Sequence, residues 1–249
     1  EKLQESQEAP EKMETEEEAE DAEAEEEDDD KDKENMEKYQ AWKSLIPFLY
    51  DWFTNHHIVW PSLSCSWGSL MEQSSFKSKY KVYLSEQTDG TTPNALIVGS
   101  LDVVKERVAS AAQISNFNEE HRSPFFRKGK RLVHPGEVNK IRECVSSPGI
   151  IATHSDVPEV YIWNTDTQPA RLHTDTKQSM PDLILTGHKE NAPFALSMST
   201  VGHSVASGGQ DHVVLTWDMK DYQSTLLSST AKTATDTPVT GRASWNSGG

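Results

Sequence analysis

The stretch His134-Pro-Gly-Glu-Val-Asn139 continues with Ile150-Ile-Ala-Thr-His-Ser-Asp156 and Val160-Tyr-Ile-Trp163. A second version of it reads Gly187-His188, Ser204-Val-Ala-Ser-Gly-Gly-Gln-Asp211 and Val213-Val-Leu-Thr-Trp-Asp218. From His134 to His188 the two versions are 54 residues apart, and each runs 29 residues from histidine to tryptophan. A segment that recurs in register at a fixed spacing predicts a chain of similar structural units.

The residue types within each unit decide what the unit is. A Gly-His or His-Pro-Gly start, a short apolar strand, a turn with aspartate and a strand ending in tryptophan are typical of one blade of a WD-repeat β-propeller. The sequence therefore predicts an all-β WD-repeat β-propeller, with clear repeats over 134–164 and 188–218.

The recurring polar residues are expected to have a structural role. A histidine, a strand Ser or Thr, a turn aspartate and a tryptophan can form a buried hydrogen-bond chain, and buried polar groups persist only when they are partnered. In the first repeat Asp156 is shifted by one position, so its contact is doubtful. We interpret His188 and Asp211 as part of such a chain and not as a catalytic dyad. The expected network comprises His134, Thr153 and Trp163 in the first repeat and His188, Ser207, Asp211 and Trp217 in the second.

The charge of the chain is concentrated at its N-terminus. The 249 residues have a formal net charge of −16, and residues 1–38 contain 20 acidic and 5 basic side chains. Like charges in runs such as Glu25-Glu-Glu-Asp-Asp-Asp30 repel one another, and such a segment has little apolar surface to bury. We expect residues 1–36 to be a disordered acidic tail that either solubilises the protein or meets basic partners.

Several classes of function are disfavoured by what the sequence lacks. Cys65 and Cys144 lie outside any metal-ligand spacing and do not suggest a disulfide framework. There is no run of about 18 apolar residues, and the acidic N-terminus does not resemble a secretory signal peptide. Phosphate-loop, nucleophile-elbow and zinc-protease motifs are also missing. We expect a protein that is not an enzyme, with no cofactor or metal and no direct contact with nucleic acid or membrane.

Two elements precede the repeats. Apolar residues from Tyr39 to Phe53 recur at spacings of three and four, which predicts an amphipathic helix over 37–57, interrupted at Pro47. Alternating apolar residues and serines predict a strand over 62–67. We assign 58–220 to a partial propeller and 221–249, which contains no further repeat, to a disordered or truncated end.

Particular motifs resemble one family. Glu37-Lys-Tyr-Gln-Ala-Trp-Lys43, Pro47-Phe-Leu-Tyr-Asp-Trp52 and Val59-Trp-Pro-Ser-Leu63 are similar to the N-terminal motifs of the retinoblastoma-binding, chromatin-assembly-factor small-subunit family. The resemblance continues through the repeats to about residue 220. Within the family, the plant FVE-type WD-repeat proteins are the most similar, on Tyr83–Gly90, Ile162–Pro169 and Phe194–Leu196.

The resemblance implies a seven-bladed ring preceded by a helix. The strand at 62–67 would complete the last blade and close the ring, residues 80–133 would form a degenerate first blade, and the two repeats would be the second and third blades. Because a blade takes about 40–45 residues, only about three of seven blades are present, and we expect a fragment or a truncated gene product.

The resemblance also implies a function. Family members bind core histones three and four as non-enzymatic adaptor or chaperone subunits of histone deacetylase, Polycomb or chromatin-assembly complexes, which implies a nuclear location and transcriptional repression. The FVE type implies control of flowering time and a cold response. Two alternatives remain: a truncated, non-functional remnant, and a substrate receptor that contacts a cullin ubiquitin ligase adaptor. For the second, Trp217-Asp-Met-Lys220 has lysine where the family motif has arginine.

Two sites follow from the resemblance. An acidic top face of the ring would take a histone tail, with the loop 86–89 at its border; its residues here would be Glu137, Asn139, Glu190, Pro61, Leu63 and Gln87. The N-terminal helix and a loop from a late blade would clasp a histone helix, and the helix side here would be Phe48, Leu49, Trp52 and Phe53.

Overall fold

The computed structural model describes residues 31–109, 114, 118–222 and 239–242. The chain forms two compact units, residues 1–53 with 109–117, and residues 54–108 with 118–249. Most of the tail expected over 1–36, and most of the end expected over 221–249, lies outside the described residues.

The first unit contains a helix that covers residues 31–49. It differs from the expected helix over 37–57, because residues 31–36 are helical and residues 50–57 are not. Glu34 and Lys38, one turn apart, form an ion pair of 2.7 Å that supports the earlier turns. The bond from the Tyr50 N–H to the Ile46 carbonyl (3.1 Å) closes the final turn, just after Pro47. No helix in the described part of the chain is long and apolar enough to cross a membrane.

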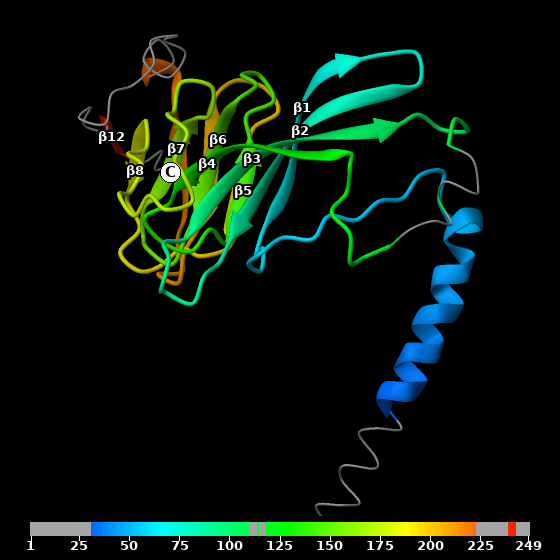
Figure 1. Cartoon of the computed structure of the whole chain (residues 1–249). Helices are drawn as coiled ribbons and strands as arrows, with labels where there is room; N and C mark the ends of the chain where they lie inside the picture. The colour runs from blue at the N-terminus through cyan, green and yellow to red at the C-terminus, as the bar shows by residue number, and fades with distance from the viewer. Residues whose placement is uncertain (1–30, 110–113, 115–117, 223–238, 243–249) are drawn as a thin grey trace, which may run out of the picture. The chain divides into compact units, whose positions relative to one another are not determined.

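The second unit contains three sheets that follow one another along the chain (Figure 1). The first sheet is an antiparallel meander in which each strand pairs with the next one in sequence. Its strands are β1 (Cys65–Gln73), β2 (Lys77–Glu86), β3 (Ala95–Val104) and β4 (Phe126–Val133).

The second and third sheets are meanders of the same kind. The second consists of β5 (Lys140–Glu143), β6 (Ile150–His154), β7 (Val160–Asn164) and β8 (Leu183–Thr186), and β12 (Val239–Arg242) pairs in parallel with β8 at its edge. The third consists of β9 (Ala195–Met198), β10 (Ser204–Gly208) and β11 (Val214–Asp218), followed by a 3₁₀ turn, η1 (Lys220–Tyr222).

These sheets confirm the predicted fold class, a partial WD-repeat propeller preceded by a helix. The repeat over 134–164 forms β5 to β7, and the repeat over 188–218 forms β9 to β11. The strand expected over 62–67 runs over Cys65–Gln73 and pairs with β2, so the first sheet begins before residue 80. The idea that this strand closes a complete ring stays a prediction.

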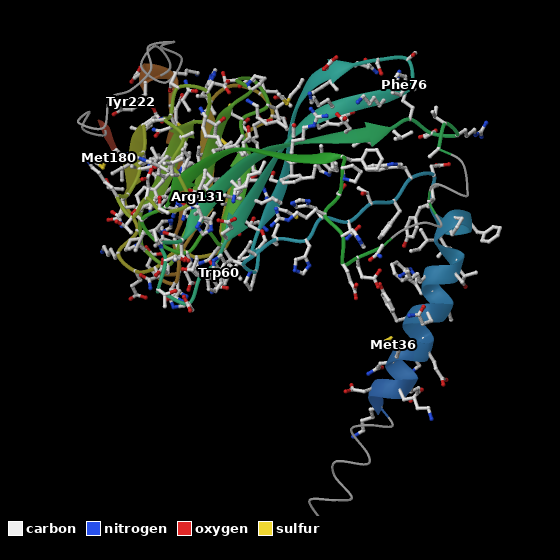
Figure 2. All side chains as sticks on the ribbon, in the orientation of Figure 1. Met36, Trp60, Phe76, Arg131, Met180 and Tyr222 are labelled. Atoms are coloured by element: carbon white, nitrogen blue, oxygen red, sulfur yellow. The ribbon has the colours of Figure 1, made fainter. Side chains whose placement is uncertain are left out.

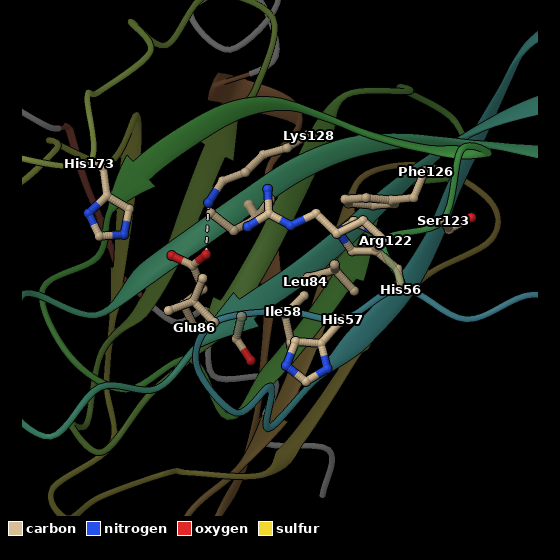
Figure 3. A pocket seen from close by; sticks show the side chains of 13 residues that line it. His56, His57, Ile58, Leu84, Glu86, Arg122, Ser123, Phe126, Lys128 and His173 are labelled. Atoms are coloured by element: carbon tan, nitrogen blue, oxygen red, sulfur yellow. Dashed lines mark hydrogen bonds and ion pairs between the residues drawn. The ribbon is translucent and has the colours of Figure 1, made fainter. Parts of the chain in front are cut away.

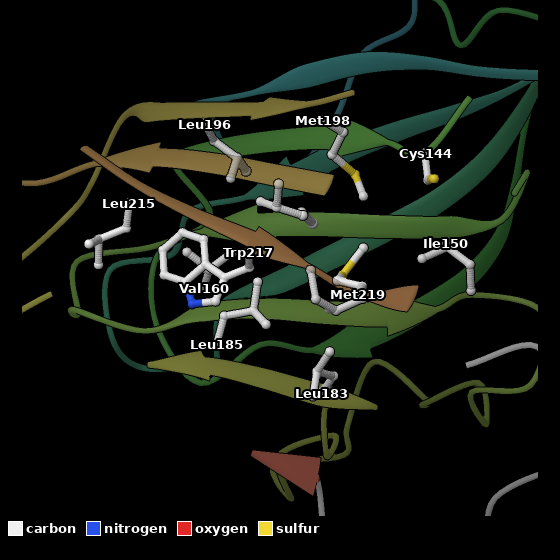
Figure 4. Packing of buried hydrophobic residues seen from close by; sticks show 13 residues of the cluster. Cys144, Ile150, Val160, Leu183, Leu185, Leu196, Met198, Leu215, Trp217 and Met219 are labelled. Carbon is white, nitrogen blue, oxygen red and sulfur yellow. The ribbon is translucent and has the colours of Figure 1, made fainter. Parts of the chain in front are cut away.

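Two apolar clusters hold the sheets together. One joins the first and second sheets through Tyr83, Leu96 and Leu132 on one side and Ile141, Ile151 and Trp163 on the other. The other joins the second and third sheets, where Trp217, Met198 and Met219 face Val160, Leu183 and Leu185 (Figure 4). Every residue of β6 and β7 is buried, because alternate side chains enter opposite clusters. Each cluster therefore acts as an interface between two blades.

The first repeat contains part of the expected hydrogen-bond chain. His134 Nε2 and Thr153 Oγ1 are 2.9 Å apart, and the indole N–H of Trp163 donates to the same hydroxyl at 2.9 Å. Asp156 does not reach His134; it accepts the backbone N–H of Glu137 (3.1 Å). With its Nδ1–H donating to the Gly136 carbonyl (2.9 Å), the neutral imidazole accepts the Thr153 hydroxyl at Nε2. Burial lowers the pKa of His134 to about 4, against a smaller opposing effect of the Gly136 bond.

The second repeat differs in its tryptophan. His188 contacts the Asp211 carboxylate through Nδ1 (3.1 Å) and Ser207 Oγ through Nε2 (2.7 Å), as the sequence predicts. The indole N–H of Trp217 instead points to the Thr186 carbonyl, 3.5 Å away. The tryptophan of this repeat therefore contributes mainly apolar packing, and the polar chain ends at Ser207.

A further histidine is buried between these two networks. His154 lies at the end of β6 with no exposed surface, and its ring centroid is 6.5 Å from that of His188. Neither ring nitrogen has a hydrogen-bond partner among the described residues. Burial, and then the proximity of His188, lowers the pKa of His154 to about 4.

We expect Trp163→Ala to lower the free energy of unfolding by about 3–5 kcal/mol, because it removes a fully buried indole and its bond to Thr153. Trp67→Ala is the matched control, since Trp67 is 60% exposed, and it should cost about 1 kcal/mol or less. Urea denaturation followed by circular dichroism measures both. Equal losses would show that the interface between the first two sheets does not control stability.

We expect stability to fall on acidification. A histidine whose folded pKa is about 4 stays neutral in the native protein, whereas the unfolded chain takes up a proton near pH 6.5. The stabilisation from each of His134 and His154 is therefore present above pH 6.5 and is lost towards pH 4, by about 1.4 kcal/mol per pH unit.

Thermal melts between pH 7.5 and 5 test this expectation. His154→Phe should melt with a shallower pH dependence than the parent chain, because it removes a group that opposes protonation without leaving a hydrogen bond unmade. His57→Phe, at an exposed position, should keep the parental dependence. The same slope for both variants and the parent would mean that other groups govern the acid sensitivity.

Candidate functional site

Six loops lie at one end of the three sheets. In an antiparallel meander, the loop before the first strand and the loop between the second and third strands share one end. Backbone bonds connect neighbouring loops: Gln87 N–H to the Pro61 carbonyl (2.9 Å), Ala192 N–H to the Val157 carbonyl (3.5 Å) and Gln210 N–H to the Asn191 carbonyl (2.8 Å). We call this end the rim; its loops are residues 61–64, 87–94, 134–139, 155–159, 187–194 and 209–213.

The rim is acidic. Lys189 is the one Lys or Arg in its six loops. The acidic side chains are Asp89, Glu137, Asp156, Glu159, Glu190 and Asp211. Of these, Glu137 and Glu190 were predicted from the resemblance. Glu159 was not, although its place in the loop before β7, next to the Asp156 turn, is the signal that could have found it.

Two of the rim carboxylates stabilise the loops themselves. Asp156 accepts the backbone N–H of Glu137, and Asp211 accepts those of Lys189 (3.0 Å) and Val213 (3.2 Å). Burial raises the pKa of Asp211, but the Lys189 N–H, His188 and the Val213 N–H together hold that pKa below its usual value. Asp211 is therefore ionised and engaged within the blade.

Glu137 and Glu190 have carboxylates that are not used in this way. Within the described part of the chain, neither carboxylate makes a hydrogen bond or an ion pair. Glu137 is half-buried and Glu190 is exposed. Both are acceptors available to a cationic ligand.

Asn139 differs from the expectation that it projects from the face beside Glu137. Its side chain is only 8% exposed, and its backbone N–H donates to the His154 carbonyl (2.9 Å) just before β5 begins. Simple strand alternation does not apply, because residues 137–139 precede the strand. Of the pair, Glu137 is the accessible member.

The first sheet contributes the rest of the predicted rim residues. Pro61 and Leu63 are exposed, and Gln87 is half-buried and bonded to the Pro61 carbonyl through its backbone. Glu86, expected at the border of this face, is instead buried. Its carboxylate lies 2.8 Å from Lys128 Nζ and 3.7 Å from Arg131 Nε.

In the first unit, the helix presents an apolar patch of Leu45, Phe48 and Leu49. Phe48 is 83% exposed and Leu49 56%. The other two predicted residues, Trp52 and Phe53, are half-buried. The Phe53 ring packs on Trp42 (5.8 Å between centroids) and on Tyr50 (5.2 Å), and Met36, nearer the start of the helix, is exposed (Figure 2). Phe48 and Leu49 are therefore the accessible residues of this predicted site.

The segment Trp217–Lys220 alternates between core and surface. Trp217 and Met219 are buried, while Asp218 and Lys220 are exposed and pair with each other at 3.4 Å. The role of this segment in contacting a cullin ligase adaptor stays a prediction. In the part of the chain that the structure describes, no group of three His, Cys, Asp or Glu side chains is placed to hold a metal ion.

Comparisons with known proteins agree with this geometry. Residues 37–105 match the family model for the histone-binding protein RBBP4, which is also the model for a CAF1-complex component. The chain is 53% identical over 191 residues to the WD-40 repeat-containing protein MSI4 of Arabidopsis thaliana, an alignment that covers 76% of this chain and 38% of that protein.

More distant relatives carry another name. Histone acetyltransferase type B subunit 2 is 30% identical over 203 residues in Aspergillus oryzae and 28% identical over 204 residues in Mycosarcoma maydis. Each alignment covers 75% of this chain but 45% and 47% of the respective relatives, so the chain spans less than half the length of the curated relatives it matches. On its motifs, its sheets and these relatives, the chain belongs to the RBBP4 and CAF1 family of histone-binding WD-repeat proteins.

Proposed function

We propose that this chain is a non-enzymatic, histone-binding WD-repeat adaptor whose rim binds the basic tail of a core histone. The observation that carries the proposal is the acidic rim, in which Glu137 and Glu190 have uncommitted carboxylates and Lys189 is the one Lys or Arg. An arginine- or lysine-rich peptide lying across the three blades would meet an acceptor on the second sheet and another on the third.

The two acceptors differ in expected strength. Glu137 is half-buried beside a loop tightened by Asp156, so a pair with an arginine there would be partly shielded from water. Glu190 is exposed, and an ion pair at an exposed position contributes about 1 kcal/mol or less and weakens with salt. Binding should therefore depend more on Glu137 and lose its Glu190 component first as salt rises.

A second contact is proposed for the helix of the first unit. An amphipathic helix binds through apolar residues spaced three or four apart, and an apolar patch in solvent is the surface it requires. The patch of Leu45, Phe48 and Leu49 has this character on a helix whose other apolar residue, Ile46, is buried. We propose that it takes the apolar face of a helix from histone four, while histone three supplies the tail for the rim.

The cellular role follows from the family as a further part of the proposal. An adaptor that holds a histone by two surfaces can present it to an enzyme carried by another subunit. We propose a nuclear subunit of a deacetylase, Polycomb or chromatin-assembly complex that acts in transcriptional repression, with roles in flowering time and cold response. The similarity to MSI4 of Arabidopsis thaliana and to proteins named as histone acetyltransferase subunits supports a chromatin-associated adaptor.

The rim is tested by the double reversal Glu137→Lys with Glu190→Lys. It should weaken binding of a labelled histone-three tail peptide, by roughly 1.5–3 kcal/mol for a desolvated contact at Glu137 and less at Glu190. The matched control is Glu106→Lys with Glu120→Lys, which makes the same charge change at exposed positions in the loop between β3 and β4. Fluorescence anisotropy at two salt concentrations measures both. Equal weakening by both pairs would mean that only net charge matters, and the rim would not be the site.

The helix patch is tested by Phe48→Ala with Leu49→Ala. Because both side chains are exposed, the helix content seen by circular dichroism should not change, whereas affinity for a histone-four helix peptide should fall about tenfold or more. Met36→Ala, also exposed on the helix, should leave affinity within about twofold of the parent. Unchanged binding after the double truncation would place the histone helix elsewhere.

A further inference from the structure

A pocket of about 410 Å³ lies on the first sheet, away from its interface with the second. The segment 56–59 crosses strands β2, β3 and β4 here, and residues 122–123 and His173 complete the wall (Figure 3). All of these residues belong to the second unit. None of the predicted rim residues lines the pocket, so it is separate from the proposed histone surface.

One side of the pocket is apolar. Ile58, Leu84 and Ile97 line it together with Phe126, on whose ring the His56 imidazole packs at 4.2 Å between centroids. Such a surface can hold a flat or aliphatic group of a ligand by burial. The pocket is therefore suited to a ligand that is not purely polar.

The other side is cationic. Lys128 and Arg131 both approach the carboxylate of Glu86, whose side chain is 6% exposed, so one buried anion serves two cations. Arg122 brings a third cation, and its guanidinium lies beside Lys128 in the same pocket (Figure 3). Among the described residues, Arg122 has no hydrogen bond or ion pair. A free guanidinium beside an already paired lysine leaves an excess of positive charge.

The histidines of the pocket show the same field. His56 Nδ1 is buried without a hydrogen-bond partner among the described residues. Burial lowers the pKa of His56, and the charges of Arg122, His57 and Lys128 lower it further. The Arg122 fork, the Lys128 ammonium and the two imidazoles thus converge on one volume in which Glu86 supplies the anion.

We propose that this pocket binds an organic phosphate monoester, with the phosphate on Arg122 and Lys128 and its organic part against Phe126 and the aliphatic wall. A guanidinium fork matches two phosphate oxygens at once, and the third oxygen remains for a lysine or an imidazole. The apolar side distinguishes a monoester from inorganic phosphate. The phosphate can belong to a free small molecule or to a phosphorylated side chain, and both present the same chemistry.

Calorimetric titration of the 249-residue chain with phenyl phosphate, inorganic phosphate and benzoate tests the ligand class. Phenyl phosphate should saturate one site and bind about tenfold or more tightly than either of the others, because only it satisfies both sides of the pocket. Equal affinity for phenyl phosphate, inorganic phosphate and sulfate, or no saturable binding, would overturn the proposal. A five-residue peptide with a central phosphoserine then distinguishes the sources: tighter binding than phenyl phosphate assigns a phosphoprotein, and weaker binding a small molecule.

Arg122→Gln tests the location. Arg122 is exposed and has no partner among the described residues, so its removal should not disturb folding, while phenyl phosphate affinity should fall about tenfold. Arg127→Gln makes the same charge change at an exposed position of β4 that does not line the pocket, and it should bind like the parent. Equal loss in both variants would reduce the effect to net charge and overturn the proposal, and so would full binding by Arg122→Gln.

Discussion

Strand β6 packs against the first sheet through Ile151 and against the third through Ile150 and Ala152. Because its successive side chains enter two different apolar clusters, the second sheet cannot move relative to one neighbour without disturbing the other. Strand β5 lies next to β1 on one side and next to β9 on the other, so the first strands of the three sheets are neighbours. The buried second sheet is the constraint on which the rest of the second unit depends.

The same constraint creates the rim. When three meanders pack face to face in one orientation, their corresponding loops come to the same end, and carboxylates that are far apart in sequence share one surface. The loops are rigid because His134 and His188 are bonded inside the blades and Asp156 and Asp211 hold the turns. Glu137 and Glu190 are thus held on ordered backbone, and a peptide that pairs with them has less loop entropy to lose.

The buried polar groups are not equivalent. Thr153 serves both His134 and Trp163, so that network is satisfied, whereas His154 has the same burial without a partner among the described residues. Arg131 lies between these cases, with backbone carbonyls of Pro93 and Leu172 for its terminal nitrogens and a distant Glu86 for Nε. Charge is thereby drawn towards the first sheet, where Arg122 remains without a counter-ion among the described residues.

The sequence by itself determined the repeats, the blade histidines and the helical, acidic and family-specific character of the N-terminal region, because these depend on local spacing and residue type. Glu137 and Glu190 could be placed on one face since each precedes the first strand of its blade. Only the tertiary structure decided that Asn139 and Glu86 are buried, that Trp217 turns to Thr186, and that β1 pairs with β2. It alone brought His56, Arg122 and Lys128 around one pocket. These outcomes depend on which side chains meet across different strands and loops, and a linear pattern contains no information about contacts between segments that the packing of the sheets brings together.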